Sequence, residues 1–261
     1  MSMQFGFSIG EELLPLLPES LPESLIYLEI DGTLLDQADT GRKLEKVCRS
    51  KALTIRDIMP GTLAEAAAEA PLQVQIDFDR SFRKRCRTAA AMGAKAITLN
   101  CNILRAVSDP EYGTLLKKML LSLAGTLEEN RILLLLPLPL PNENCNREMF
   151  LKLLDYQHKL FYPGIKYLAE FYFDENNAFE TLADYLDVFC FDHNFLRLSC
   201  EPEPGMFLTA DTLKKIRSFE TPNSLSWYIT LAPGYAAIAP ETFRRIDRLI
   251  SEAVPDGESS R

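Results

Sequence analysis

The sequence predicts an α/β protein whose eight parallel strands close into a (β/α)8 barrel. Eight short apolar segments occur along the chain, and helical patterns separate most of them, as expected for parallel βα units. The length of 261 residues matches the roughly 250 residues that such a barrel needs. An open doubly wound sheet is the alternative. No glycine-rich phosphate loop follows the first strand, which argues against a dinucleotide-binding version of that sheet.

Each predicted strand is a run of apolar or alternating residues that ends at glycine, proline, acidic or amide residues. In chain order, the predicted strands are Met3–Gly10, Ser24–Gly32, Ala52–Pro60, Lys95–Asn102, Arg131–Pro141, Tyr167–Asn177, Leu186–Asn194 and Leu225–Gly234. Prolines alternate with leucines in the second half of the fifth strand. Because proline has no N–H to donate, we expect its hydrogen-bonded part to end near Leu136.

Helices are predicted between these strands from capping residues and amphipathic spacing. The segment Asp79–Met92 is expected to begin at a cap, Asp79 or Ser81, and to stop at Gly93. The segment Asp109–Glu129 is a long amphipathic pattern with Pro110 in its first turn. The remaining expected helices are Glu11–Leu17, Gly41–Ser50, Arg147–Leu160, Ala178–Tyr185, Thr209–Phe219 and Ala239–Ala253.

Composition limits the domain organisation and the partners. We expect residues 1–254 to form one barrel domain and residues 255–261 to form a polar tail. The net charge of −9 repels phosphate backbones, so no nucleic acid partner is expected. No apolar run is long enough to cross a membrane, and the first residues lack the pattern of a signal peptide. Six scattered cysteines without a CxxC pair indicate reduced thiols, and we therefore expect a cytoplasmic protein.

Polar residues recur on one side of the predicted strands, and that side is expected to line the barrel. Asp31, Asp174 and Asp192 lie at strand ends, where the active sites of such barrels are found. For Arg56, Glu29 and Glu170, a structural ion-pair network deep in the barrel is an equally open interpretation. The predicted inner set is Gln4, Ser8, Glu29, Asp31, Arg56, Thr98, Asn100, Glu170, Asp174, Asp192, Tyr228 and Thr230.

Three stretches carry a family resemblance: YLEIDG in the second strand, FDENN at the end of the sixth, and LADYLDVFCFDHN after it. With the eight βα units, they resemble the xylose isomerase-like barrels, which include sugar-phosphate isomerases, sugar-phosphate epimerases and endonuclease IV. The resemblance covers nearly the whole chain but rests on order and spacing. It implies a function as a sugar or sugar-phosphate isomerase or epimerase that acts on a small polyhydroxy substrate.

The resemblance also implies a divalent metal, Mn, Mg, Co or Zn, held by acids and histidines at the ends of strands five to eight. This sequence departs from that pattern. Leu136 and Pro137 replace the acid of strand five. Asn177 and Phe189 stand where the family has histidines, and Ala232 stands near the position of the expected acid of strand eight. Asp174 and Asp192 remain as metal-ligand candidates. With so few ligands, we expect no bound metal.

Candidate roles follow from this resemblance and from the strand faces. Glu29, Asp174 and His193 are the candidate catalytic residues, although His193 can also be read as an ordinary loop histidine. The candidate substrate-binding residues are Asp31, Arg56, Asn100, Glu170 and Asp192. The alternative function is a non-catalytic barrel that binds or senses a small molecule. A homodimer stays open, because barrels of this type often dimerise. Cleavage of abasic DNA needs a multi-metal cluster and ranks last.

Overall fold

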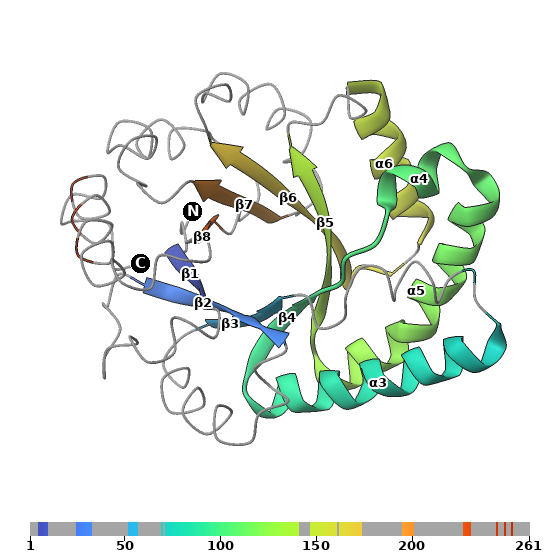
Figure 1. The fold of residues 1–261 in the computed structure, drawn as a ribbon, viewed down its shortest axis with the longest axis horizontal. Helices are drawn as coiled ribbons and strands as arrows, with labels where there is room; N and C mark the ends of the chain where they lie inside the picture. Colours follow the sequence, from blue (N-terminus) through green and yellow to red (C-terminus); the bar gives the residue numbers. More distant parts are fainter. Residues whose placement is uncertain are drawn as a thin grey trace.

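The fold was derived from a computed structural model of the chain (Figure 1). The structure describes residues 5–9, 25–32, 52–56, 69, 71–140, 147–160, 162–173, 195–200, 227–230, 244, 248 and 252. Among them, no helix is long and apolar enough to cross a membrane.

Eight parallel strands form a closed barrel in chain order. They are β1 (Phe5–Ile9), β2 (Leu25–Asp31), β3 (Ala52–Arg56), β4 (Ala94–Thr98), β5 (Leu133–Leu140), β6 (Ile165–Phe173), β7 (Phe195–Cys200) and β8 (Trp227–Thr230). Each strand pairs with the next along the chain, and β1 pairs with β8 to close the cylinder. The predicted (β/α)8 barrel is therefore confirmed, and the open sheet is excluded.

The seventh strand is not the predicted segment. We expected Leu186–Asn194, but β7 is Phe195–Cys200, in register with β6 and β8. Residues 186–194 lie outside the described part of the chain. Both segments are short and rich in apolar residues, so the composition of the sequence favours them about equally. Strand pairing in the barrel decides between them.

The strand β5 continues through both prolines, which corrects its expected end near Leu136. Leu135 faces β4, since its carbonyl accepts a hydrogen bond from the N–H of Leu99 at 2.9 Å. Backbone groups alternate in direction along a strand, so Pro137 and Pro139 also face the β4 side. The ladder between β4 and β5 stops at Leu135. At Pro137 and Pro139 there is therefore no neighbouring strand on the β4 side to which a backbone N–H could donate, so proline costs no ladder hydrogen bond. On its other side, β5 stays paired with β6 through Leu140.

Four described helices lie outside the barrel wall in Figure 1: α3 (Leu72–Ala91), α4 (Ile103–Ser108), α5 (Pro110–Asn130) and α6 (Arg147–Lys159). The predictions for α5 and α6 are confirmed within one residue at each end. The side chain of Asp109 caps α5 by accepting hydrogen bonds from the N–H groups of Glu111 and Tyr112 at 3.1 Å. The N–H of Tyr112 is also the main cause of the lowered pKa of Asp109.

Two helix predictions need correction. The helix α3 begins at Leu72, seven residues before the expected cap at Asp79, and its N-cap is Pro71, which makes no side-chain cap bond. With no capping side chain there, the sequence offers no start signal. The short helix α4 was not predicted, although Asn102 caps it with a 3.0 Å bond from the N–H of Arg105. Gly93 is confirmed as the stop after α3, at a φ of +84° that favours glycine.

The other expected helices lie outside the described residues, except for three positions of the last one. Arg244, Arg248 and Glu252 are helical and exposed, and their spacing of four residues places them on one side of that helix.

The barrel wall buries a different set of residues on each side. On the outer side, the hydroxyl of Tyr167 in β6 donates a 2.6 Å hydrogen bond to the carbonyl of Leu153 in α6. Tyr167 therefore faces the helices, and neighbours of the opposite parity, such as Leu168, face the lumen. Fully buried helix residues such as Phe82 and Phe150 complete the core. The aromatic Tyr167 of β6 thus packs outward against α6, as the sequence predicted for that side of the strand.

Alkaline pH is expected to destabilise the protein through three buried groups. Burial raises the pKa of Cys86 from 9.0 to about 12. Burial also raises the pKa values of Tyr156 and Tyr167 above the usual 10.0. Above about pH 9, the folded protein keeps protons that the unfolded chain releases, so stability falls as pH rises, by up to about 1.4 kcal/mol per pH unit for each group.

The measurement is the free energy of unfolding in urea between about pH 8 and about pH 11. The variant Tyr156→Phe lacks one of the three groups and should show a shallower fall. An unchanged free energy of unfolding across this range would contradict the expectation.

Candidate functional site

An apolar cluster lines the lumen at β4, β5 and β6, and it forms the described floor of the barrel. Ala96, Leu135 and Leu168 form a buried cluster, and Leu133 packs against it. These residues come from β4, β5 and β6. Along their strands they alternate with outward-facing residues such as Tyr167 and Ile97, so they are on the lumen side of the wall. A dry floor of this kind strengthens electrostatic interactions of polar groups placed above it.

Two polar residues are buried on the same side of the wall. Glu29 in β2 is in register with Thr54, and Thr54 is in register with Ala96 of the floor cluster. Register therefore assigns Glu29 to the lumen, where its side chain is 1% exposed. Thr98 in β4 is fully buried, and its Oγ1 atom has no hydrogen-bond partner among the described residues. Sequence reasoning placed both residues on the inner side, and the structure agrees.

Two residues of opposite charge are in register at the carboxyl ends of β2 and β3. Asp31 is in register with Arg56, and both are the last residues of their strands. Neither is in register with Glu29 or Glu170, so the ion-pair network considered for Arg56 with those acids does not follow from the strand pairing. Asn100 lies two residues beyond β4 and is exposed. These three residues all occur at the carboxyl ends of strands, where ligand sites of such barrels lie.

One member of a second charged row, Arg197, was missed by sequence reasoning. Glu170 in β6 is partly buried, and it is in register with Arg197 of β7, which is in register with Tyr228 of β8. Residues in register on parallel strands share a face. Glu170 is two residues after Leu168 in the same strand, so it is on the lumen side as well. Arg197 was missed because the seventh strand was misassigned. The available signal was the alternation Leu196, Arg197, Leu198 that follows Asn194.

Three predicted site residues, Asp174, Asp192 and His193, lie outside the described residues. Asp174 directly follows β6, in agreement with the expectation that it comes at a strand end. Asp192 and His193 precede β7 in the chain, so the prediction that they lie at the carboxyl-terminal tip of the seventh strand is wrong. Their positions relative to Glu29 are outside the described part of the chain, and their roles remain predictions.

The described residues do not form a metal site. No group of three or more histidine, cysteine, aspartate or glutamate side chains in the described part of the chain lies close enough together to hold a metal ion. Strand β5 contributes only leucine and proline to the wall. The metal role predicted for Asp174 and Asp192 is untested, because both lie outside the described residues. The described residues alone therefore do not supply the ligands of the divalent metal that the family resemblance implies.

Replacing Thr98 with valine is expected to raise the free energy of unfolding by about 1 kcal/mol. The substitution exchanges a buried hydroxyl without a partner for a methyl group of similar size, which removes a desolvation cost. Urea denaturation measures the change, and Thr126→Val in α5 is a matched control, because Thr126 Oγ1 is also buried without a partner. A loss of stability in the Thr98 variant alone would indicate that its hydroxyl has a partner in solution.

Solved structures of the same fold cover nearly the whole chain. A 3-keto-D-glucoside 4-epimerase from E. coli is 12% identical with a TM-score of 0.61, over 95% of this chain and 99% of its own. A xylose isomerase domain protein from Alicyclobacillus acidocaldarius is 11% identical with a TM-score of 0.60, over 97% and 99%. A structure of IOLI protein with a bound zinc atom is 12% identical with a TM-score of 0.56, over 97% and 100%.

No model of a known protein family matches the sequence, and no curated protein matches it. At identities near 12%, the structural likeness establishes the fold alone. The chain therefore has the xylose isomerase-like (β/α)8 barrel fold, as the resemblance predicted.

Proposed function

We propose that the carboxyl end of this barrel binds a small polyhydroxy, sugar-like molecule and transfers a proton next to its carbonyl group, as a sugar isomerase or epimerase does. One observation carries the proposal: the buried carboxyl group of Glu29 faces the lumen beside an apolar floor. The solved structures of the same fold include a 3-keto-D-glucoside 4-epimerase, and this supports the choice of reaction.

Isomerisation and epimerisation both begin by removing a proton from a carbon beside a carbonyl. The reaction needs a base on one face of the substrate and a positive or hydrogen-bonding group at the carbonyl oxygen. Glu29 is the base in this proposal, and Asp174 or Glu170 supplies a second carboxyl for epimerisation. Arg56 is always charged and serves as the electrophile, with His193 as the second candidate for that role.

Substrate hydroxyl groups need acceptors and donors around the barrel mouth. Asp31 and Asn100 occur at the carboxyl ends of β2 and β4, and Glu170 and Arg197 share a register row between β6 and β7. Asp192 completes the proposed set of binding residues. Rows of opposite charge suit a neutral polyhydroxy molecule, because its hydroxyl groups both donate and accept hydrogen bonds.

The second candidate is a barrel that binds such a molecule without converting it. Strand β5 favours this candidate, since Leu136 and Pro137 occupy the part of the wall where the resembled family carries an acid.

Solvent deuterium exchange distinguishes the two candidates. The protein is incubated in deuterium oxide with a panel of ketoses and aldoses, with and without Mn²⁺, Mg²⁺ or Co²⁺, and the sugars are analysed by NMR and mass spectrometry. Exchange above background supports the isomerase or epimerase. Saturable stabilisation of the protein by a sugar without exchange supports the binding protein. Neither response across the panel would overturn both.

The variant Glu29→Gln keeps the size of the side chain and removes its charge. If Glu29 is the base, the exchange rate falls by about 10²-fold while the affinity for the sugar changes little. Glu128→Gln is the control, since Glu128 is an exposed carboxylate on α5. Equal rates in the two variants would remove Glu29 from the mechanism.

A further inference from the structure

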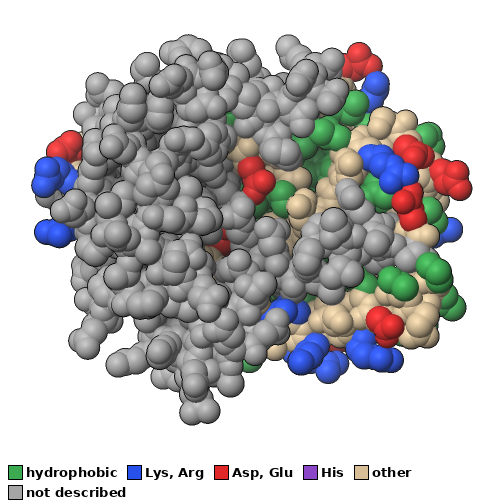
Figure 2. Space-filling view, viewed as in Figure 1, with side chains coloured by type: hydrophobic (Ala, Val, Ile, Leu, Met, Phe, Trp, Pro, Cys, Tyr) green, Lys and Arg blue, Asp and Glu red, His purple; other side chains and the backbone are tan. Residues whose placement is uncertain are grey.

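A strongly basic stretch lies within this acidic chain. Residues 80–108 contain seven basic residues and no acidic one, although the whole chain carries a net charge of −9. Five of the seven are in α3, at positions 80, 83, 84, 85 and 87. Figure 2 shows Lys and Arg side chains gathered along the edge of the molecule that α3 occupies in Figure 1. The positive charge is therefore concentrated on one helix.

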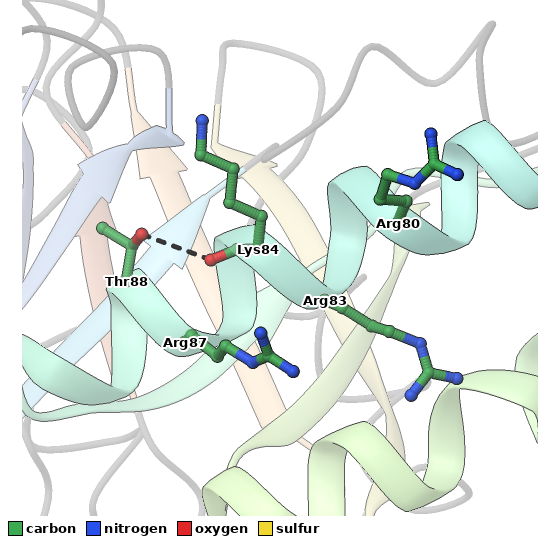
Figure 3. Close-up of a pocket in the computed structure, with 5 residues that line it drawn as sticks. All are labelled: Arg80, Arg83, Lys84, Arg87 and Thr88. Atoms are coloured by element: carbon green, nitrogen blue, oxygen red, sulfur yellow. Dashed lines mark hydrogen bonds between the residues drawn. The ribbon is translucent and has the colours of Figure 1, made fainter.

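Helical spacing arranges four of these side chains in two adjacent rows. Arg80, Lys84 and Thr88 follow one another at intervals of four residues, and Arg83 and Arg87 form the second row. Neighbours in a row are about 6 Å apart along the helix axis. In Figure 3, Arg83 and Arg87 project to one side of the helix, and Lys84 and Arg80 project away from them.

Lys84 and Arg87 make no side-chain hydrogen bond or ion pair with the described residues, and both are exposed. The other two cations each have a nearby acid. Arg83 donates a 2.7 Å hydrogen bond to Asp79, and Arg80 lies 3.5 Å from Asp77 in an exposed pair. The positive charge that is left unneutralised is thus centred on Lys84 and Arg87.

The two rows line a hollow on the surface. Arg80, Arg83, Lys84, Arg87 and Thr88 all border it, and its volume is about 420 Å³ (Figure 3). This volume lies within the range of roughly 300–1,000 Å³ that small-molecule sites occupy. The opposite side of α3, with Phe78, Phe82, Cys86 and Ala89, packs into the core. The hollow is therefore on the outside of the barrel and separate from the lumen site.

We propose that this hollow binds a small anion that carries two or more phosphoryl groups. Arginine and lysine side chains contact phosphate through charge-assisted hydrogen bonds, and cations about 6 Å apart along each row provide contacts for more than one phosphoryl group. A ligand with a single charge would gain too little from exposed cations to overcome the repulsion of a chain with a net charge of −9.

The extent of the positive surface favours a short ligand over a long nucleic acid strand. A long polyanion lying along α3 would meet Asp77 and Asp79 within one turn of Arg80. Like charges would repel it there. A compact polyphosphate centred on Lys84 and Arg87 lies farther from those acids, which pair with Arg80 and Arg83.

The test is calorimetric titration of the full-length protein with inorganic tripolyphosphate at low salt. We expect saturable binding with one site per chain. The double variant Lys84→Gln/Arg87→Gln should weaken binding about tenfold or more, since it removes two charged hydrogen-bond donors. The control Lys118→Gln/Lys152→Gln removes the same charge from exposed sites on α5 and α6 and should bind like the unmodified protein.

Further arms identify the source of the phosphoryl groups. Vesicles with and without phosphatidylinositol bisphosphate and a single-stranded oligonucleotide are tested with the same variants. Vesicle binding that tripolyphosphate displaces supports the site and indicates a lipid headgroup as its source. Absence of saturable tripolyphosphate binding, equal weakening in both double variants, or binding of the oligonucleotide alone would overturn the proposal.

Discussion

Replacing Gly113 with alanine is expected to lower the free energy of unfolding by about 3 kcal/mol or more. Gly113 lies in the first turn of α5, where the carbonyl of Ala106 in α4 approaches it. An added Cβ atom would lie 2.2 Å from that carbonyl oxygen, a distance that real Cβ contacts do not reach. The neighbour is backbone, so it cannot rotate away.

The backbone around Gly113 is also fixed from a third helix. The hydroxyl of Tyr156 in α6 donates a 2.8 Å hydrogen bond to the carbonyl of Gly113. A shift of α5 that relieved the alanine clash would stretch this bond. The three helices meet at this point, so the strain cannot be absorbed by one of them alone.

Gly125→Ala in the same helix is the matched control. No atom lies within 4 Å of the Cβ that this substitution would add. Alanine favours a helix interior over glycine, so we expect a gain of about 0.5–1 kcal/mol. Urea denaturation of both variants gives the two values. A similar change in both would show that α4 does not contact α5 at Gly113 in solution.

Replacing Leu135 with alanine is expected to lower the free energy of unfolding by about 3 kcal/mol. Leu135 is fully buried in the floor cluster with Ala96 and Leu168. Removing its isobutyl group leaves a cavity in the lumen, because strands on both sides hold the wall in place. The walls of a closed barrel relax little, so the loss of stability should lie well inside the range measured for replacing a buried leucine with alanine.

Leu151→Ala is the control for this prediction. Leu151 is 56% exposed on α6, and its replacement is expected to change stability by about 0.5 kcal/mol or less. Thermal and urea denaturation of the two variants measure the contrast. If Leu135→Ala were as stable as Leu151→Ala, the floor of the lumen would not be a packed core.

The local sequence was sufficient for the buried strands and for the well-capped helix. Glu29 alternates with Leu28 and Ile30, and this alternation alone predicted that Glu29 and Ile30 face opposite sides of the wall. Asp109 followed by Pro110 predicted the start of α5, because both residues act on the first helical turn itself. In each case the signal and its physical cause lie within a few residues.

The seventh strand and the prolines of β5 needed information from elsewhere in the chain. Whether residues 186–194 or Phe195–Cys200 joins the barrel depends on which segment pairs with β6 and β8. Whether Pro137 and Pro139 interrupt β5 depends on where β4 ends. Both mistakes propagated to the site, since they hid Arg197 and shortened the wall beside Glu170.

The amino-acid sequence by itself determined that this protein is a (β/α)8 barrel with Glu29 and Thr98 on its inner side. Alternation along a strand is a local property, and it fixes which side each residue faces. The tertiary structure alone decided which residues become neighbours across strands, including Asp31 with Arg56 and Glu170 with Arg197. Register depends on pairing between distant segments, and no single segment encodes its partner.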